Sequence, residues 1–222
     1  MPLPSATPTA AGEAMGVAPP RPTVGVLALQ GAFSNHLSVL AELGVVGRAV
    51  RRPDDLEGID ALILPGGEST TMSMLLDSSE LRAPLTDLLD RDLPVLGTCA
   101  GLILLSSRVD DGRDDQRGFG RLDLRTARNA YGRQNESFES RVELADGRSI
   151  PGIFIRAPRI VEVGPEVEVL GALDGVPVLI RQGNAIGCAF HPELTGDATV
   201  HRLLIDRIGR SLTTVSDASQ ED

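Results

Sequence analysis

Runs of apolar residues divide the first half of the chain into strands and helices. The continuous apolar run Val24–Leu29 is typical of a strand buried on both faces, and the helically spaced apolar positions after it end at Gly44. Two further runs, Val45–Val50 and Ile59–Leu64, predict the next strands, and another helix is expected from about Met72. This half of the chain therefore alternates strands with helices.

The second half is richer in short strands separated by glycine and proline turns. The charged segment 108–121 is expected to be a surface loop, and a last helix is predicted over Ala198–Gly209. The predicted strands are Phe138–Leu144, Ile150–Ile155, Val167–Leu173, Val176–Arg181 and Ala185–Phe190. Together the two halves predict an α/β fold of flavodoxin-like type: a mostly parallel, doubly wound sheet with helices on both faces, extended by antiparallel strands.

The polar ends of the sequence frame one expected domain. With 222 residues, a single core over 23–212 is the expectation, preceded by a disordered extension (1–22) rich in Pro, Ala, Thr and Ser and followed by a disordered acidic tail (213–222). The N-terminus lacks the basic and apolar regions of a signal peptide, and no apolar stretch approaches about 18 residues. We therefore expect a soluble cytoplasmic protein with no membrane partner.

Composition excludes several kinds of chemistry. The net charge is -10, and all 21 basic residues are arginines, so this chain offers no lysine for a Schiff base or a phosphate-binding P-loop. An acidic chain with 3% aromatic residues and no basic stripe offers little to nucleic acid. The two cysteines form no Cys-x-x-Cys pair, so neither a zinc site nor a disulfide framework is expected. Small molecules and proteins are the expected partners.

Cys99 interrupts an apolar strand just before an apolar helix. Gly97 and Gly101 flank it at a spacing typical of a nucleophile elbow, a tight strand-to-helix turn that exposes the nucleophile to the free N–H groups of the new helix. A buried cysteine that only packs is the competing interpretation.

Three histidines could serve as the general base for the thiol, and such a base usually needs a second group to orient it. His36, near the start of a helix, and His201, in the last helix, are most simply surface or capping residues. His191 follows a buried strand, and Pro192 favours an extended backbone in which His191 and Glu193 point to the same side. The sequence thus suggests a thiol, an imidazole and a carboxylate acting together, although His-Pro-Glu also fits an ordinary turn.

Backbone N–H groups for an oxyanion are also available. The Gly66–Gly67 pair follows a buried strand, and its N–H groups could act with that of Ala100, directly after the nucleophile. Taken alone, the glycine pair fits a phosphate-binding turn or a plain tight turn equally well.

Six segments together give a specific resemblance. The chain resembles the glutaminase subunits of pyridoxal 5′-phosphate synthase, which are class I (triad) glutamine amidotransferases, from about Val24 to Ile208. The elbow and His-x-Glu are shared by class I amidotransferases generally, whereas the fourth and fifth segments are particular to this subfamily. The segments are Gly25–Gly31, Leu64–Thr71, Gly97–Gly101, Arg128–Gln134, Phe154–Pro158 and Phe190–Thr195.

The resemblance implies a reaction and a role for each matching residue. Cys99 attacks the side-chain amide of L-glutamine and forms a thioester, with His191 as general base and then acid and Glu193 orienting His191. The N–H groups of Gly67 and Ala100, which the residues themselves suggest for an oxyanion hole, fit this reaction. The implied glutamine pocket consists of Gly67, Glu68, Ser69, Arg128, Ile155 and Arg156. No cofactor or metal is implied.

The resemblance also implies a protein partner. In the family, the ammonia passes to a separate synthase subunit that assembles pyridoxal phosphate, and Gln30 resembles a residue that links the glutamine site to partner docking; it also fits a polar residue that merely ends a strand. Two alternatives remain open at this point: a class I amidotransferase subunit serving another acceptor, and a non-catalytic flavodoxin-like regulatory module.

Overall fold

The structure is a computed structural model that describes residues 21–112, 116–128 and 137–217, the last nine of these by their backbone alone. Most of the extension expected to be disordered (1–20) and the end of the tail (218–222) therefore lie outside the described residues. Among those that are described, no helix has the length and apolar character needed to cross a bilayer.

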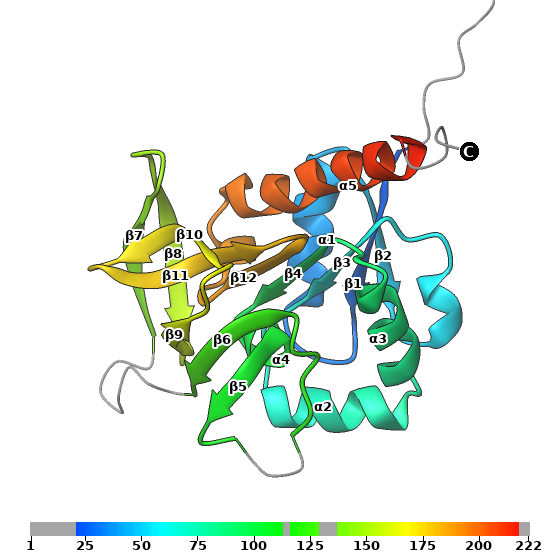
Figure 1. Ribbon diagram of the computed structural model, residues 1–222, viewed down its shortest axis with the longest axis horizontal. Helices are drawn as coiled ribbons and strands as arrows, with labels where there is room; N and C mark the ends of the chain where they lie inside the picture. The colour runs from blue at the N-terminus through cyan, green and yellow to red at the C-terminus, as the bar shows by residue number, and fades with distance from the viewer. Residues whose placement is uncertain (1–20, 113–115, 129–136, 218–222) are drawn as a thin grey trace, which may run out of the picture.

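A nine-stranded sheet organises the chain, in the order β2-β1-β3-β4-β12-β11-β10-β7-β8 (Figure 1). Its first five strands are parallel, and every residue of β3, β4 and β12 is buried, as the continuous apolar runs predict. These strands are β2 (Val46–Val50), β1 (Thr23–Leu27), β3 (Ala61–Leu64), β4 (Val95–Thr98) and β12 (Ala185–Cys188).

The remaining four strands of this sheet are antiparallel to their neighbours. They are β11 (Val176–Gln182), β10 (Glu168–Leu173), β7 (Ser137–Leu144) and β8 (Ser149–Ile155). The predicted fold class, a mostly parallel sheet with an antiparallel extension, is confirmed.

Helices cover both faces of the parallel strands. α1 (Phe33–Glu42) and α5 (Thr199–Asp217) lie on one face, and α2 (Ser69–Ser78), α3 (Arg82–Asp90) and α4 (Ala100–Leu105) lie on the other (Figure 1). The chain also forms two 3₁₀ turns, η1 (Pro53–Leu56) and η2 (Pro192–Leu194). Leu27, Leu62, Leu64 and Phe190 are among the fully buried side chains of the single core that these layers enclose.

The expectation that 108–121 is a surface loop is wrong at its start. Three strands, β5 (Ser106–Asp110), β6 (Leu122–Ala127) and β9 (Arg159–Val163), form a second sheet that the apolar pattern does not predict. Arg125 on β6 pairs with Asp110 on β5 at 2.9 Å and with Glu162 on β9 at 2.5 Å. The charges at the start of the segment 108–121 suggested a loop, but charged residues also occupy the solvent face of a sheet, and here they lie on paired strands.

Two helix boundaries differ from the prediction. α5 continues to Asp217 rather than ending at Gly209, so it includes residues 213–217 of the tail expected to be disordered. A single glycine costs a helix only about 1 kcal/mol and no proline follows, so the helix is free to continue. α2 begins at Ser69 rather than near Met72, because the side chain of Glu68 caps it.

Candidate active site

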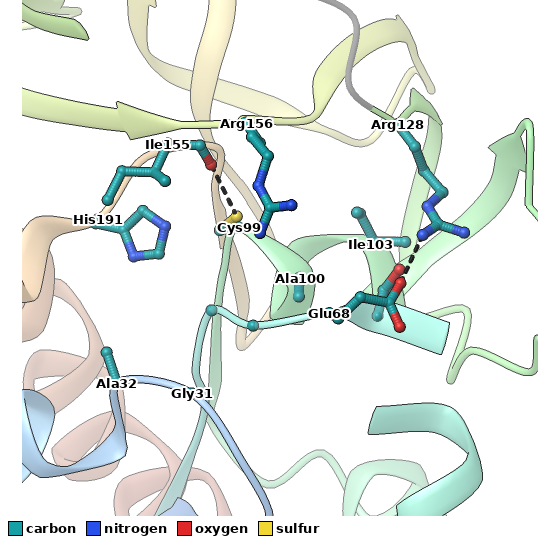
Figure 2. A pocket seen from close by; sticks show the side chains of 13 residues that line it. Gly31, Ala32, Glu68, Cys99, Ala100, Ile103, Arg128, Ile155, Arg156 and His191 are labelled. Atoms are coloured by element: carbon teal, nitrogen blue, oxygen red, sulfur yellow. Dashed lines mark hydrogen bonds and ion pairs between the residues drawn. The ribbon is translucent and has the colours of Figure 1, made fainter. Parts of the chain in front are cut away.

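A cavity of ≈ 370 Å³ opens where the carboxyl ends of β1, β3, β4 and β12 meet (Figure 2). This edge of an open parallel sheet is where α/β proteins bind ligands. The cavity brings together nearly all of the predicted site residues. Glu193 and Gln30 do not line it, but each contacts a residue that does, Glu193 contacting His191 and Gln30 contacting Glu68. Those that line it are Gly67, Glu68, Ser69, Cys99, Ala100, Arg128, Ile155, Arg156 and His191.

Cys99 lies on a sharp turn between β4 and α4. Its φ of 50° and ψ of -104° are a strained backbone conformation of the kind found at nucleophile elbows. The flanking residues must be small: a Cβ on Gly97 would come 2.6 Å from the backbone of Gly101, and one on Gly101 would meet the carbonyl of Leu64. The interpretation of this segment as an elbow is therefore correct in its geometry.

His191 and Glu193 form the second part of the site. Nδ1 of the His191 ring lies 2.7 Å from Oε1 of Glu193, and the backbone N–H of His191 donates to the backbone carbonyl of Ile153 on β8 at 2.8 Å. The route to this contact differs from the prediction, because Pro192–Leu194 is a 3₁₀ turn and not an extended segment. The turn folds the carboxylate back under the ring, and both side chains are buried.

The buried surroundings favour a charged His191. Burial acts to lower its pKa, but the hydrogen bonds and charges of Cys99 and Glu193 outweigh burial and raise the pKa to about 10. Burial acts to raise the pKa of Glu193, but its hydrogen bond to His191 and the charges of His36 and His191 lower it overall. The raised pKa of His191 and the lowered pKa of Glu193 thus support an imidazolium held against a carboxylate, beside the Cys99 sulfur.

The Gly66–Gly67 turn packs against the same histidine. A Cβ on Gly66 would approach the His191 ring within 3.0 Å of Cε1, so only glycine allows the imidazole to lie there. Gly67 has φ +154°, and Gln30 donates from Nε2 to the carbonyl of Glu68 at 2.6 Å. This hydrogen bond from Gln30 therefore holds the glycine turn in place.

Glu68 and Arg128 pair with each other across the mouth of the cavity, at 2.6 Å (Figure 2). The Glu68 carboxylate also accepts from the N–H of Thr71 at 2.6 Å and of Thr70 at 3.2 Å. Burial acts to raise its pKa, but these hydrogen bonds and the charge of Arg128 lower the pKa to about 2. An anionic Glu68 and a cationic Arg128 are therefore fixed side by side, a contact that the sequence did not predict.

The turn after β8 supplies the remaining wall. The Cys99 thiol points to the carbonyl of Ile155, with Sγ 3.9 Å from that oxygen. Arg156 has a positive φ of 43°, and its side chain extends over the cavity toward Cys99 (Figure 2). Among the described residues, no carboxylate forms an ion pair with Arg156. Ser69 also lines the cavity, and its buried hydroxyl has no hydrogen-bond partner among the residues that the structure describes.

Several residues at the site were not singled out from the sequence. Gly31, Ala32 and Ile103 line the cavity. Ile103 is four residues after Cys99, one helical turn on, and Gly31 lies in the short segment between β1, which ends at this edge, and α1. The sequence positions of both residues could therefore have indicated the site.

The interpretation of His36 and His201 as surface or capping residues is wrong. Both are completely buried, and both lie behind Glu193. Their burial depends on contacts between the first and last helices, which no local pattern contains. In the described ranges, no three His, Cys, Asp or Glu side chains are grouped to hold a metal ion.

Curated relatives match more than four fifths of this chain. Proteins named pyridoxal 5′-phosphate synthase subunit PdxT from Mycobacteroides abscessus and Streptomyces coelicolor are each 49% identical over 189 residues, which is 84% of this chain and 97% and 94% of those proteins. The counterpart from Corynebacterium jeikeium is 50% identical over 184 residues, covering 82% of this chain and 94% of that protein.

Solved structures agree with the fold. A crystal structure described as a glutamine amidotransferase superimposes with a TM-score of 0.79 at 42% identity, covering 84% of this chain and 98% of that one. A chain of the PurLQS structure from Thermotoga maritima shares the fold at a TM-score of 0.57 and 15% identity, over 88% of this chain and 99% of that one. The profile of the SNO glutamine amidotransferase family matches residues 26–210. This chain belongs to the SNO glutamine amidotransferase family.

Proposed function

We propose that this chain hydrolyses L-glutamine to L-glutamate and ammonia and delivers the ammonia to a synthase subunit that makes pyridoxal 5′-phosphate. The observation that carries the proposal is the meeting of Cys99, on its strained turn, with the His191–Glu193 pair at one cavity. Relatives of 47–50% identity carry the name of a pyridoxal 5′-phosphate synthase subunit, which favours this acceptor over another. An intact thiol, imidazole and carboxylate argue against a non-catalytic module.

The chemistry proceeds in two stages. With the Cys99 proton held on His191, the Cys99 sulfur attacks the amide carbon of glutamine as a thiolate, so that negative charge develops on the amide oxygen. The N–H groups of Gly67 and Ala100 are proposed to stabilise that charge. The His191 imidazolium protonates the leaving nitrogen, ammonia departs, and a thioester remains; water, deprotonated by His191, then releases glutamate and restores the thiol.

The cavity wall supplies groups for a free amino acid. Glutamine carries an ammonium and a carboxylate, which call for fixed opposite charges at the mouth of the site. We assign the ammonium to Glu68 and the carboxylate to Arg128 and Arg156, with Ser69 and the backbone of Ile155 completing the pocket. Because Glu68 is already held by Thr70, Thr71 and Arg128, its carboxylate needs little reorganisation when glutamine binds.

Delivery of ammonia calls for a hetero-oligomer, and we propose that Gln30, which braces the glycine turn, links the site to docking of the synthase subunit. Residues 23–212 are proposed to form the glutaminase domain. Both cysteines are free thiols, and a thiol nucleophile works in a reducing compartment, which supports a cytoplasmic location.

The test is glutamate release from glutamine, measured with and without the synthase subunit. We expect weak release by the chain alone and a clear rise with the partner. Cys99→Ala should abolish release, by at least about 10³-fold, because the nucleophile is lost. Cys188→Ala is the matched control: this second thiol is buried, and burial raises its pKa well above the usual value, so its removal should leave release intact. Full activity in Cys99→Ala would overturn the proposed mechanism.

A further inference from the structure

All three histidines of the chain lie in one buried line behind the thiol. His191 contacts Oε1 of Glu193, the second carboxylate oxygen Oε2 faces Nε2 of His36 at 3.5 Å, and Nδ1 of His36 lies 2.9 Å from Nε2 of His201. His36 comes from α1 and His201 from α5, and both are fully buried. The catalytic mechanism above uses neither of them.

The contacts favour one placement of the protons. A carboxylate oxygen only accepts, so the placement that avoids two facing lone pairs puts the hydrogen of His36 on Nε2, toward Glu193, and the Thr98 hydroxyl at 3.4 Å can then accept as well. Nδ1 of His36 is then an acceptor, and Nε2 of His201 must donate to it. That leaves Nδ1 of His201 without a proton. This atom and Glu193 Oε2 are two of the three buried side-chain atoms that lack a hydrogen-bond partner within the described ranges. For Oε2, the N–H of His36 is the donor placed to approach it, from 3.5 Å.

The surroundings keep both rings neutral. The groups that face His36 are Glu193 on η2, His191 beside it, His201 on α5 and the hydroxyl of Thr98 on β4, 3.4 Å from Nε2. Burial lowers the pKa of His36 to about 4, against the opposing charge of Glu193, and burial lowers the pKa of His201 to about 3. Neutral rings have the single N–H each that the line of contacts requires.

We propose that His36 and His201 are positioning residues that act as a neutral two-imidazole relay, directing one N–H at the second oxygen of Glu193 and so fixing the carboxylate that orients His191. This inference rests on the proposed function, since it gives Glu193 its orienting role. His36 holds Oε2 while His191 holds Oε1, so the carboxylate is clamped from both sides. His201 selects the tautomer of His36 that makes the clamp.

The first test determines the tautomers by ¹⁵N NMR of the full chain labelled with ¹⁵N-histidine. The chain has three histidines, and the signals lost in His36→Gln and in His201→Gln assign the resonances of those two rings. We expect His36 and His201 to be neutral Nε2–H tautomers at pH 7 and His201→Leu to shift His36 toward the Nδ1–H form. Observation of His36 as an Nδ1–H tautomer in the unsubstituted chain, or of either ring protonated at pH 7, overturns the relay.

The second test reads catalysis in the complex with the synthase subunit. His36→Leu keeps the volume but removes the donor, and it should lower kcat by about tenfold or more with KM within about twofold. His36→Gln places an amide N–H near the same point and should restore most of kcat. Leu85→Ala, a buried core variant on α3, is the control: it should reduce stability while kcat and its pH profile stay unchanged.

The outcomes separate the two proposals. Equal losses in His36→Leu and His36→Gln, or a wild-type kcat and pH profile in His36→Leu, overturn the relay. If the unsubstituted chain releases no glutamate with its partner, the proposed function fails, and the tautomers still decide the relay by themselves. Should His36→Leu not fold, His201→Leu and the tautomer measurement decide the matter.

Discussion

Gly66→Ala tests whether the glycine turn is shaped for the imidazole of His191. The added Cβ would lie 3.1 Å from Nδ1 and 3.3 Å from Nε2 of the ring, and within 3.0 Å of Cε1. The ring must withdraw by about 1 Å to reach ordinary van der Waals contact. Because Nδ1 is held by Glu193 at 2.7 Å, that withdrawal stretches the contact that orients the base.

The expected cost falls on the reaction and not on the fold. A displacement of about 1 Å at a reacting group lowers the rate by about 10²-fold, so kcat for glutamate release should fall by that order. Gly66 does not have a positive φ, so alanine there should change the free energy of unfolding by less than about 1 kcal/mol. Steady-state kinetics in the complex and urea unfolding of the chain measure the two effects.

Two glycines provide matched controls. Gly112→Ala meets only ordinary contacts at 3.6 Å and should leave both kcat and stability unchanged. Gly44→Ala has open space but a φ of +72°, so it should cost about 1 kcal/mol of stability without affecting kcat. A Gly66→Ala variant with wild-type kcat would refute the inference that the imidazole rests on this turn.

Four further outcomes follow from the same site. Arg128→Ala should raise KM for glutamine by roughly 10-fold or more, because a charge-assisted bond of about 1.5–3 kcal/mol is lost; steady-state kinetics measure it, and an unchanged KM would remove Arg128 from the pocket. The alkaline limb of kcat should fall near pH 10, where His191 loses the proton that the leaving nitrogen needs; a limb near pH 7 would contradict the raised pKa. Stability should decline as pH falls from 6.5 toward 4, since unfolded His36 takes up a proton that the folded ring refuses; the loss is about 3 kcal/mol from His36 alone, and urea unfolding of His36→Gln should show it reduced. Iodoacetamide should alkylate Cys99 and spare the fully buried Cys188, as peptide mapping would report; equal labelling would argue against a selectively reactive Cys99.

The parts of the site that are local in sequence could be predicted from it. The elbow at Cys99 depends on small residues at fixed spacing between a strand and a helix, and all of these are neighbours in the chain. His191 and Glu193 are two residues apart, so their contact was expected even though the backbone forms it by a 3₁₀ turn. Patterns local in sequence therefore identified the residues of both features, but they did not predict the backbone conformation between His191 and Glu193.

The parts that depend on distant partners could not be predicted. His36 and His201 are 165 residues apart, and only the packing of α1 and α5 on one sheet face makes two polar rings a buried pair. Likewise, the charged segment from 108 to 121 suggested a loop, whereas its start, including Asp110, pairs as β5 with β6. The pairing of Glu68 with Arg128 joins residues 60 positions apart and turned two separate candidates into one unit.

The contact between the first and last helices has a consequence for biosynthesis. During translation, β1, β3 and β4 and the elbow at Cys99 are complete long before His201 leaves the ribosome, and the strand that brings in His191 is itself late in the chain. A nascent or truncated chain that lacks α5 has an exposed sheet face over β3 and β4 and no partner for His36. The buried contacts behind Glu193 therefore form only after α5, which is synthesised later than both the elbow and His191, has packed on the sheet.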